Sequence, residues 1–586
     1  MYDIVIRNGT IVDGTGQPAF MGDVAITGDR IVAVGTVEGS GAREIDAKGL
    51  MVTPGWVDMH THFDGQATWD PYCSPSGWHG VTTVVMGNCG VGFAPCRPED
   101  RDWLIQVMEG VEDIPGSALS EGIQWDWETF PEYLDALERR PFALDVAAQV
   151  PHSALRAYVM GDKRSEQEDP TAEEIGQMRD LVAEALEAGA LGFSTSRTSL
   201  HKTARGVLVA GTHAPREELF GIGEALKQTG KGVFECASEH VTVPDEFLWY
   251  RELAEEVGRP VVFNLSQIDE NPSLYEDVLG MLDDCEAKGI PVYAQCAGRS
   301  IGICMSFQAT AHPFAAYPAW LEMLHDSWED KKAKLLDPEF QQMLLAQEPF
   351  PVWDFAEKIT KSWDKMYPLR DGNSYEPDPS ESVAAVAERT GRAPQAVALE
   401  WLLENDGNGM MYFPLFNYSE GSLAPLHKLH QHPRTRMGLS DGGAHCGAIC
   451  DAGMPSFMIS YWTRDRTRGP TLPLEHMVMR QTKQTAEFYG LRDRGVLKPG
   501  YLADVNVFDY DGLQLGCPEV VYDLPAGGRR LLQRAEGYKF TIKSGTFTFE
   551  NGQATGEMPG GLLRGEQELP GDVVLQPVSG SPRPVA

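Results

Sequence analysis

Two histidines spaced two residues apart are the side chains of this sequence best suited to bind a metal. His60 and His62 stand in PGWVDMHTHFD, at the end of the apolar run MVTPGWVD, which predicts a buried strand. In an extended chain, residues i and i+2 point to the same side, so both imidazoles can share one divalent cation. Such pairs are common by chance, but the carboxyl end of a barrel strand is where barrel enzymes carry out their chemistry. We therefore predict a metal site here.

The string PGWVDMHTHFD resembles the opening motif of the amidohydrolase superfamily. The resemblance implies a (β/α)8 barrel with one or two metal ions at its mouth, where amide or ester bonds are hydrolysed. It also implies that an aspartate from the last barrel strand joins the two histidines, and Asp441 in MGLSDGGAH has the matching place. A carboxylate that touches both metal and water can move a proton from the attacking water to the leaving amine. The alternative for Asp441 is a helix cap or a turn contact.

A second motif, HGVTTVVMGNCGVGFAP, is most similar to the N-acyl-D-amino-acid deacylase branch of that superfamily. In this branch a cysteine from the second barrel strand binds the metal, and Cys89 has that position. Hydantoinase-like relatives use a carboxylated lysine from the fourth strand instead, but the segment ALGFSTSRT contains no lysine. The resemblance therefore favours Cys89 as a thiolate ligand over a small buried thiol beneath the site. It extends over nearly the whole chain, through VPHSALRAYVMG and DRGVLKPGYLADVNVFD.

The sequence departs from the deacylase pattern on the fifth and sixth strands, where that branch carries metal-binding histidines. The matching segments read FECASEH and FNLSQID. Gln267 takes the place on the sixth strand. On the fifth strand the place falls near Cys236 or Ala237, and His240 would reach it only if the strand end bulges. We therefore expect one metal ion, a zinc, held by His60, His62, Cys89 and Asp441.

Further candidates for contact with a substrate lie at or near predicted strand ends: His152, Arg197, His201, His240, Gln267 and His445. Arg197 could clamp a substrate carboxylate, because its planar fork offers two parallel hydrogen bonds. A salt bridge on a surface loop is the alternative for this arginine. The histidines could contact the substrate, cap a helix, or fix the orientation of a metal ligand.

The expected function is hydrolysis of a C–N amide bond by metal-activated water, with Asp441 as the proton shuttle. An N-acyl D-amino acid is the substrate that the resemblance implies. The missing histidines on strands 5 and 6 leave open a cyclic amide, a carbamate, a dipeptide or an ester. A non-catalytic barrel that binds a ligand is the third alternative, although a decayed site has no reason to retain all four predicted metal ligands.

Amphipathic helices alternate with short β-branched runs in the part of the chain that must position these residues. This pattern is typical of a parallel sheet with helical crossovers. Four helices are predicted to end at glycine directly before a strand: Gly189, Gly230, Gly258 and Gly289. Nine candidate strands compete for the eight places of a barrel. We exclude MYFPLF, because it follows a long helical and polar stretch at about 316–408 that looks like an insertion.

The predicted fold class is α/β: a TIM-like (β/α)8 barrel with a small β-sandwich domain formed from both chain ends. Strand and turn patterns place the β domain at residues 1–52 and 497–560, and the barrel with its insertion at 53–496. Residues 565–586 carry Gly, Pro and Ser and predict an arm without a core. The insertion and its neighbouring loops would cover the barrel mouth and set specificity.

Composition and charge narrow the possible partners. The formal net charge of -36 disfavours nucleic acid and anionic lipid headgroups. The first residues alternate like a strand rather than an export signal, and no run reaches the roughly 18 apolar residues that span a bilayer. Ten scattered cysteines fit buried thiols in a reducing compartment better than disulfides. We expect a cytoplasmic enzyme with a small-molecule substrate and no nucleic-acid or membrane partner; the resemblance allows a homo-oligomer.

Overall fold

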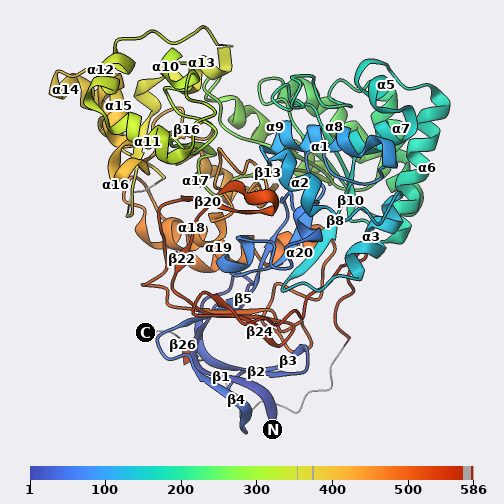
Figure 1. Ribbon diagram of the computed structural model, residues 1–586. Coiled ribbons are helices and arrows are strands. Elements are labelled where there is room, and N and C mark those ends of the chain that lie inside the picture. Colours follow the sequence, from blue (N-terminus) through green and yellow to red (C-terminus); the bar gives the residue numbers. More distant parts are fainter. Residues whose placement is uncertain (353, 373–374, 572–582, 585–586) are drawn as a thin grey trace.

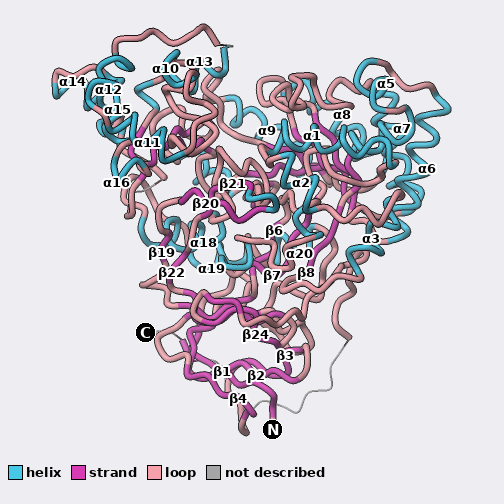
Figure 2. Tube along the Cα trace, viewed as in Figure 1, coloured by secondary structure: helices cyan, strands magenta, loops and turns pink. Residues whose placement is uncertain are grey.

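The computed structural model describes residues 1–352, 354–372, 375–571 and 583–584 (Figure 1). Strands near both chain ends form a base, and a larger body of strands and helices rises above it in two lobes (Figure 2). Among the described residues, no helix is both long and apolar enough to cross a membrane.

Parallel strands form the centre of the body, in the order in which they occur along the chain. One sheet contains β6 (Trp56–Asp58), β7 (Val81–Met86) and β8 (Asp145–Ala148). The second sheet follows the order β9 (Val150–Pro151), β10 (Gly192–Ser196), β11 (Val233–Ala237), β12 (Val261–Asn264), β13 (Val292–Cys296) and β17 (Thr435–Met437). Only Gln149 separates β8 from β9, so the chain runs directly from one sheet into the other.

The first and last of these parallel strands meet just beyond their carboxyl ends. Thr61 and Gly442 form a parallel bridge, and the backbone N–H of His62 donates to the carbonyl of Gly442 at 2.7 Å. The predicted α/β architecture is confirmed by this run of parallel strands with helices between them. Residues that follow the first and the last strand are thereby brought side by side.

Helices connect the parallel strands from β9 to β13. After β9 to β12 they are α4 (His152–Met160), α5 (Asp162–Gln167), α6 (Ala172–Ala188), α7 (Arg216–Thr229), α8 (Val243–Val257) and α9 (Leu274–Lys288). A capping box of Thr171 and Glu174 starts α6. The four predicted helix ends are confirmed, because the backbone turns left-handed at Gly189, Gly230, Gly258 and Gly289.

The other helices of the body come before and after this series along the chain. Between β7 and β8 the chain forms α1 (Arg101–Glu112), α2 (Gly116–Gly122) and α3 (Phe130–Glu138). Helix α17 (Ala424–Gln431) leads into β17, which is followed by α18 (Met454–Ser460), α19 (Leu474–Arg480) and α20 (Lys483–Phe488).

The second lobe is an insertion between β13 and α17 with a sheet of its own. Its strands are β14 (Gly302–Met305), β15 (Tyr367–Leu369) and β16 (Met410–Pro414), and they pair antiparallel. The segment MYFPLF forms β16, so it lies outside the parallel series, as predicted. The helices are α10 (Pro318–Leu321), α11 (Trp328–Leu336), α12 (Pro338–Leu345), α13 (Asp354–Lys361), α14 (Val383–Thr390), α15 (Pro394–Leu402) and α16 (Glu404–Gly407).

The base joins strands from both chain ends in a single connected sheet of ten strands. Its members are β1 (Tyr2–Ile11), β2 (Phe20–Thr27), β3 (Arg30–Gly35), β4 (Gly41–Asp46), β5 (Met51–Pro54), β18 (Val505–Phe508), β23 (Tyr538–Lys543), β24 (Thr546–Glu550), β25 (Gln553–Ala554) and β26 (Arg583–Pro584). A small β-sandwich domain was the expectation, and hydrogen bonds join all ten strands of the base into one sheet. The strands stay connected because β1 pairs first with β4 and then with β5 along the same side. Apolar residues from both chain ends form one core, including Ile6, Val52, Val505 and Ile542.

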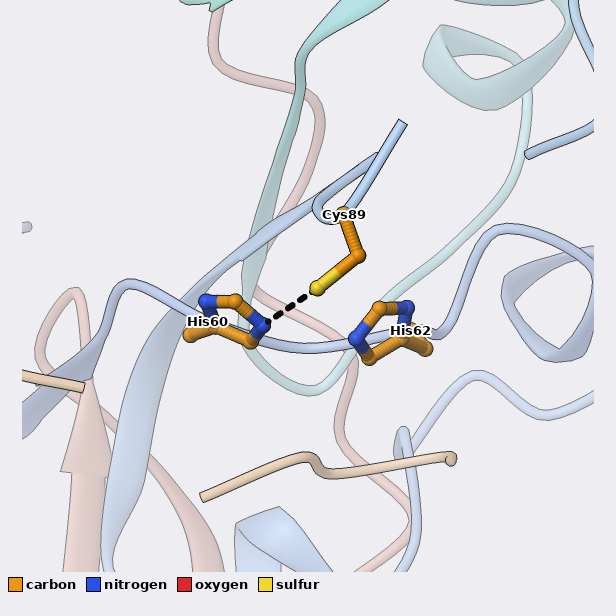
Figure 3. A group of neighbouring side chains, drawn as sticks. All are labelled: His60, His62 and Cys89. Atoms are coloured by element: carbon orange, nitrogen blue, oxygen red, sulfur yellow. Dashed lines mark hydrogen bonds between the residues drawn. The ribbon is translucent and has the colours of Figure 1, made fainter. Parts of the chain in front are cut away.

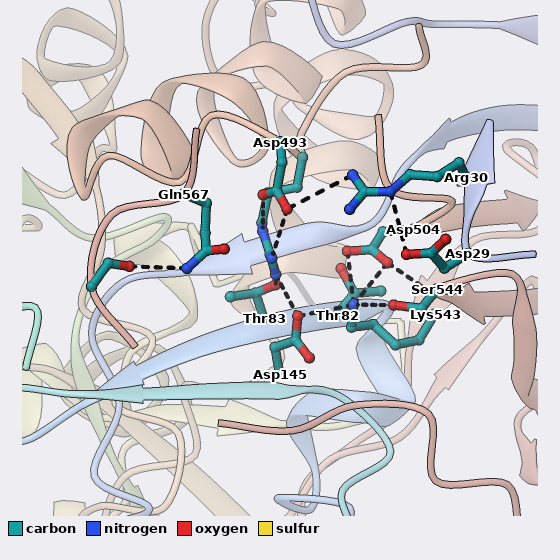
Figure 4. Close-up of polar contacts among 12 residues, drawn as sticks. Asp29, Arg30, Thr82, Thr83, Asp145, Asp493, Asp504, Lys543, Ser544 and Gln567 are labelled. Carbon is teal, nitrogen blue, oxygen red and sulfur yellow. Dashed lines mark hydrogen bonds and ion pairs between the residues drawn. The ribbon is translucent and has the colours of Figure 1, made fainter. Parts of the chain in front are cut away.

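A buried network of charges ties the base to the parallel strands (Figure 4). Asp145, the first residue of β8, contacts Lys543 at 2.9 Å and Arg494 at 2.5 Å. Lys543 also reaches Asp504 at 3.0 Å, and Arg494 reaches Asp493 at 3.0 Å. Every cation in this network has at least one carboxylate, which is the condition under which buried charges are tolerated.

Candidate metal centre

The two histidines that follow β6 lie side by side in the interior. Their side chains are 0% and 1% exposed for His60 and His62. In Figure 3 a ring nitrogen of each histidine and the sulfur of Cys89 point into the space between the rings. Ligand atoms of these three residues all lie within 4.8 Å of one another. A zinc ion lies roughly 2.0–2.3 Å from its nitrogen and sulfur ligands, so donor atoms within this span can converge on one ion after small shifts of the side chains.

Cys89 and Asp441 complete a ring of donor atoms around this space. The Nε2 atom of His60 lies 3.2 Å from the sulfur of Cys89 and 3.4 Å from Oδ1 of Asp441. The Nε2 atom of His62 lies 3.6 Å from the same Oδ1 atom. The structure therefore brings together all four predicted metal ligands, drawn from the ends of β6, β7 and β17.

Unusual backbone conformations aim three of the side chains around this space. Cys89, Asp441 and His445 have positive φ angles of 57°, 50° and 48°. Residues with a Cβ seldom adopt this left-handed region, and such conformations cluster at functional sites. At Cys89 the turn is held by Glu235 on β11, whose Oε2 accepts the backbone N–H of Cys89 at 2.9 Å.

Each strand-1 histidine has a side-chain oxygen near its other ring nitrogen. The Nδ1 atom of His60 lies 2.7 Å from Oε1 of Gln295 on β13. The Nδ1 atom of His62 lies 3.2 Å from Oε1 of Glu112, the last residue of α1. If Nδ1 of His60 carries the proton that Gln295 accepts, then Nε2 keeps its lone pair for a metal.

The pKa values of the two histidines are shifted in opposite directions. Burial lowers the pKa of His60 to about 4, so its ring is neutral and able to bind a metal. Burial also acts to lower the pKa of His62, but the charges of Glu112 and Asp441 outweigh it and raise that pKa to about 9. Because a metal ion and a proton compete for a ring nitrogen, a cation bound here would take the proton's place on His62.

The carboxylate and the thiol respond to the same surroundings in opposite ways. Burial favours the neutral acid of Asp441, yet the hydrogen bond with His62 and the charge of that ring hold its pKa below the ordinary value. Burial, followed by the charges of Glu235, Glu112 and Asp441, raises the pKa of Cys89 well above its ordinary value. Asp441 is thus ionised at neutral pH, whereas Cys89 needs a nearby cation to become a thiolate.

Several buried carboxyl groups surround the four ligands. Besides Asp441 and Glu112, three buried carboxyl groups lie close by, and burial raises the pKa of Asp58 and Asp64 to about 7 and that of Glu235 to about 8. None of the ion pairs between described residues joins these five to lysine or arginine. A divalent cation would favour the ionised forms of these carboxyl groups, which is a second reason why the donor set fits a metal ion.

A cavity of about 650 Å³ opens above the four ligands. Its walls combine the metal ligands with apolar side chains of the insertion lobe, among them Ile303 on β14 and Ile359 on α13. Predicted substrate residues that line the cavity are His201, His240 and His445. The ring of His201 is held by Ser196, whose Oγ lies 2.9 Å from Nδ1.

Three predicted substrate residues lie away from the cavity walls. Arg197 is already bound to a carboxylate, because Nε and Nη2 reach Glu246 at 3.0 and 3.3 Å. His152 is fully buried, with Nε2 2.9 Å from Glu218 and Nδ1 2.8 Å from Thr195. The geometry does not bring them to the substrate space. The place of a residue just after a strand does not determine whether its side chain points into the cavity.

Gln267 is turned to the neighbouring loops instead of the cavity. Its side-chain amide donates to Pro272 at 3.3 Å and accepts from the backbone of Ser419 at 3.1 Å. Asn264, the last residue of β12, lines the cavity at that strand. On β11 the residue that lines it is Ala237, which has no ligand atom in its side chain.

Sequence reasoning missed four residues of this site: Glu112, Glu235, Asn264 and Gln295. A signal existed for three of them, because Glu235, Asn264 and Gln295 are polar residues within apolar strands. Glu112 ends an amphipathic helix in a connection between strands, and nothing in its local pattern separates it from a solvent-facing residue.

The chain belongs to the Amidohydrolase family, whose model matches residues 43–549. It is 27% identical over 571 residues to the D-aminoacylase of Alcaligenes xylosoxydans xylosoxydans, covering 96% of this chain and 97% of that protein. It is also 27% identical over 584 residues to the N-acyl-D-aspartate deacylase of the same organism, covering 98% and 96%. The resemblance to this superfamily that the motifs predict is thereby confirmed.

Solved structures of similar proteins share the fold along nearly the whole chain. One, on the functional role of the binuclear metal center in D-aminoacylase, has a TM-score of 0.63 at 25% identity, covering 96% of this chain and all of that one. An N-acyl-D-glutamate deacylase from Bordetella bronchiseptica, complexed with zinc and a phosphonate inhibitor, has a TM-score of 0.63 at 23% identity, covering 96% and 99%. Family membership and the ligand cluster together make this chain a metal-dependent hydrolase of carbon–nitrogen bonds.

Proposed function

We propose that this protein hydrolyses the amide bond of an N-acyl D-amino acid at one zinc ion held by His60, His62, Cys89 and Asp441. The observation that carries the proposal is the meeting of two imidazoles, a thiol and an ionised carboxylate at the floor of a 650 Å³ cavity. Two relatives that each cover at least 96% of this chain are named D-aminoacylase and N-acyl-D-aspartate deacylase, which supports the substrate class.

We further infer that the parallel strands close into an eight-membered barrel, with β8 and β9 counted as one. Their chain order and the bridge between Thr61 and Gly442 support this closure. A single metal ion is proposed because the only ligand group found among the described residues is that of His60, His62 and Cys89. Gln267 and Ala237 add no ligand from the sixth and fifth strands.

Asp441 is the group that moves protons in the proposed reaction. A divalent ion at the four ligands lowers the pKa of water and polarises a carbonyl group. Asp441 is ionised at neutral pH and accepts the proton of the attacking water, then passes it to the leaving nitrogen. His201 is neutral, since burial lowers its pKa to about 3, and with Nδ1 held by Ser196 its Nε2 can contact the substrate.

The cavity walls favour an acyl group or side chain that is large and apolar. Apolar residues of the cavity come from the insertion lobe and its junction, including Ile301, Ile303, Ile359, Leu415 and Phe416. Carboxylates of Glu109, Glu112 and Asp113 lie on the same walls and would repel a second carboxylate on the substrate. An N-acyl derivative of an apolar D-amino acid therefore fits the cavity better than one of aspartate or glutamate.

A substrate panel tests this proposal. The purified chain is assayed with N-acetyl-D-leucine, N-acetyl-L-leucine, N-acetyl-D-glutamate, a dipeptide, a cyclic amide and an ester. We expect the highest kcat/KM with the D-leucine derivative. Turnover of only the dipeptide, the cyclic amide or the ester would keep the metal-dependent hydrolase and overturn the proposed substrate class.

A further inference from the structure

Glu112 is a buried carboxylate for which the reaction described above has no use. It is the last residue of α1, a helix between β7 and β8 that lies outside the parallel strands, and its side chain is 1% exposed. Its ion-pair partners among the described residues are two histidines, His62 and His445, and neither lysine nor arginine. The Oε2 atom makes no hydrogen bond with any described residue.

Folding alone gives little reason to place a carboxylate at this position. An ionised group that is buried without a strong cation is strongly unfavourable. The carboxyl end of a helix carries partial negative charge, so an acidic residue there is also disfavoured by the helix dipole. The contacts with the two histidines must therefore supply the reason for Glu112.

The position of Glu112 relative to His62 matches that of Gln295 relative to His60. In both pairs a side-chain oxygen faces Nδ1, at 3.2 Å and 2.7 Å, while Nε2 faces Asp441. The contact of His62 is an ion pair and not an aligned hydrogen bond, since Nδ1 of His62 is among the buried atoms without one. A carboxylate behind a metal-binding histidine fixes its tautomer and orientation and strengthens it as a ligand.

The second oxygen of Glu112 reaches toward the substrate side of the site. Its Oε2 atom lies 3.7 Å from Nε2 of His445, which lines the cavity and has a side chain that is 26% exposed. The loop of His445 is anchored to the same helix end, because the backbone N–H of Cys446 donates to the carbonyl of Glu112 at 3.2 Å. One residue thus contacts a predicted metal ligand and a cavity histidine at once.

We propose that Glu112 is a positioning residue that holds His62 for the metal and His445 for the substrate. The inference rests on the proposed function, because it assigns Glu112 to the same metal site. This role would make α1, a helix outside the parallel strands, part of the structure that supports the metal site.

The inference is tested by the zinc affinity of Glu112 variants. This affinity is measured by competition with a chromophoric chelator. We expect Glu112→Ala to bind zinc about 10–100-fold more weakly than the parent chain. Glu112→Gln keeps an oxygen acceptor behind His62 and should recover most of the affinity. The thermal midpoint of the metal-free protein is measured in both variants and should fall by too little to account for the loss of zinc affinity, since no lysine or arginine loses its partner.

Glu218→Gln provides a matched control, because Glu218 is a buried carboxylate that pairs with His152 outside the cavity. This substitution should lower the thermal midpoint and leave zinc affinity unchanged. The inference is overturned if Glu112→Ala binds zinc as tightly as the parent, or loses zinc only in proportion to lost thermal stability. A parent chain that binds no zinc would overturn both proposals. Glu112-dependent zinc binding without hydrolysis of any N-acyl amino acid would contradict the proposed function alone and support this role of Glu112.

Discussion

The Nε2 atom of His62 lies 3.6 Å from Oδ1 of Asp441, although the two residues are separated by most of the chain. The contact exists because the segments after β6 and β17 are joined by the bridge between Thr61 and Gly442. The predicted metal ligand from the first strand and the proposed proton-carrying group from the last are therefore held by one backbone connection.

Replacing Asp441 with asparagine should abolish turnover. The amide cannot accept a proton from water, and the loss of its positioned base should lower kcat by about 10²–10⁴-fold. Steady-state kinetics with metal content measured on the same sample checks this. Wild-type kcat in Asp441→Asn would show that another group moves the proton.

The variants His60→Ala and His62→Ala should lose zinc and turnover together while keeping the fold. Each removes one imidazole from the group of three donors. Metal analysis, circular dichroism and activity measured side by side separate these effects. His213→Ala is a control, because His213 lies on the exposed surface and is absent from the cavity walls. Normal turnover in either strand-1 variant contradicts the metal site.

Shortening the apolar wall should change substrate preference. Ile359 on α13 lines the cavity, and Ile359→Ala removes about 1 kcal/mol of apolar contact from a large side chain. The ratio of kcat/KM for N-acetyl-D-leucine over N-acetyl-D-alanine should fall about 5-fold. An unchanged ratio would mean that the substrate side chain does not reach this helix.

The charge network at the base predicts a pH dependence of stability. The pKa of Asp145 is lowered: burial opposes its ionisation, but the charges of Lys543 and Arg494 outweigh that cost. A carboxyl group with a lowered pKa contributes stability above its unfolded pKa of about 3.9, and this contribution is lost as the pH falls through the folded pKa. The parent chain should therefore lose stability below about pH 4.

The variant Asp145→Asn tests this network. It leaves two buried cations with fewer partners, so the free energy of unfolding at pH 7 should fall by roughly 3 kcal/mol. Denaturant unfolding at pH 7 and pH 3.5 gives the comparison. The difference between the two proteins should shrink at the lower pH. A constant difference would show that Asp145 does not titrate as described.

The parts of the site that sequence predicts are those fixed locally. His60 and His62 share a strand end, and Cys89 and Asp441 follow strands whose apolar runs are plain in the sequence. The partners behind the histidines were missed because Glu112 and Gln295 reach them from distant elements. For Arg197 the sequence leaves a substrate clamp and a salt bridge both open, because its pairing with Glu246 depends on where α8 packs. The single connected sheet of the base likewise depends on pairing between distant strands, which no local sequence pattern reveals.

Removal and return of the metal test the central claim most directly. The protein is stripped with a chelator, its metal content is measured, and hydrolysis of N-acetyl-D-leucine is followed as zinc is added back. Hydrolysis should vanish in the stripped protein and return in proportion to zinc, saturating near one ion per chain. Full activity in protein shown to be free of metal would contradict the account.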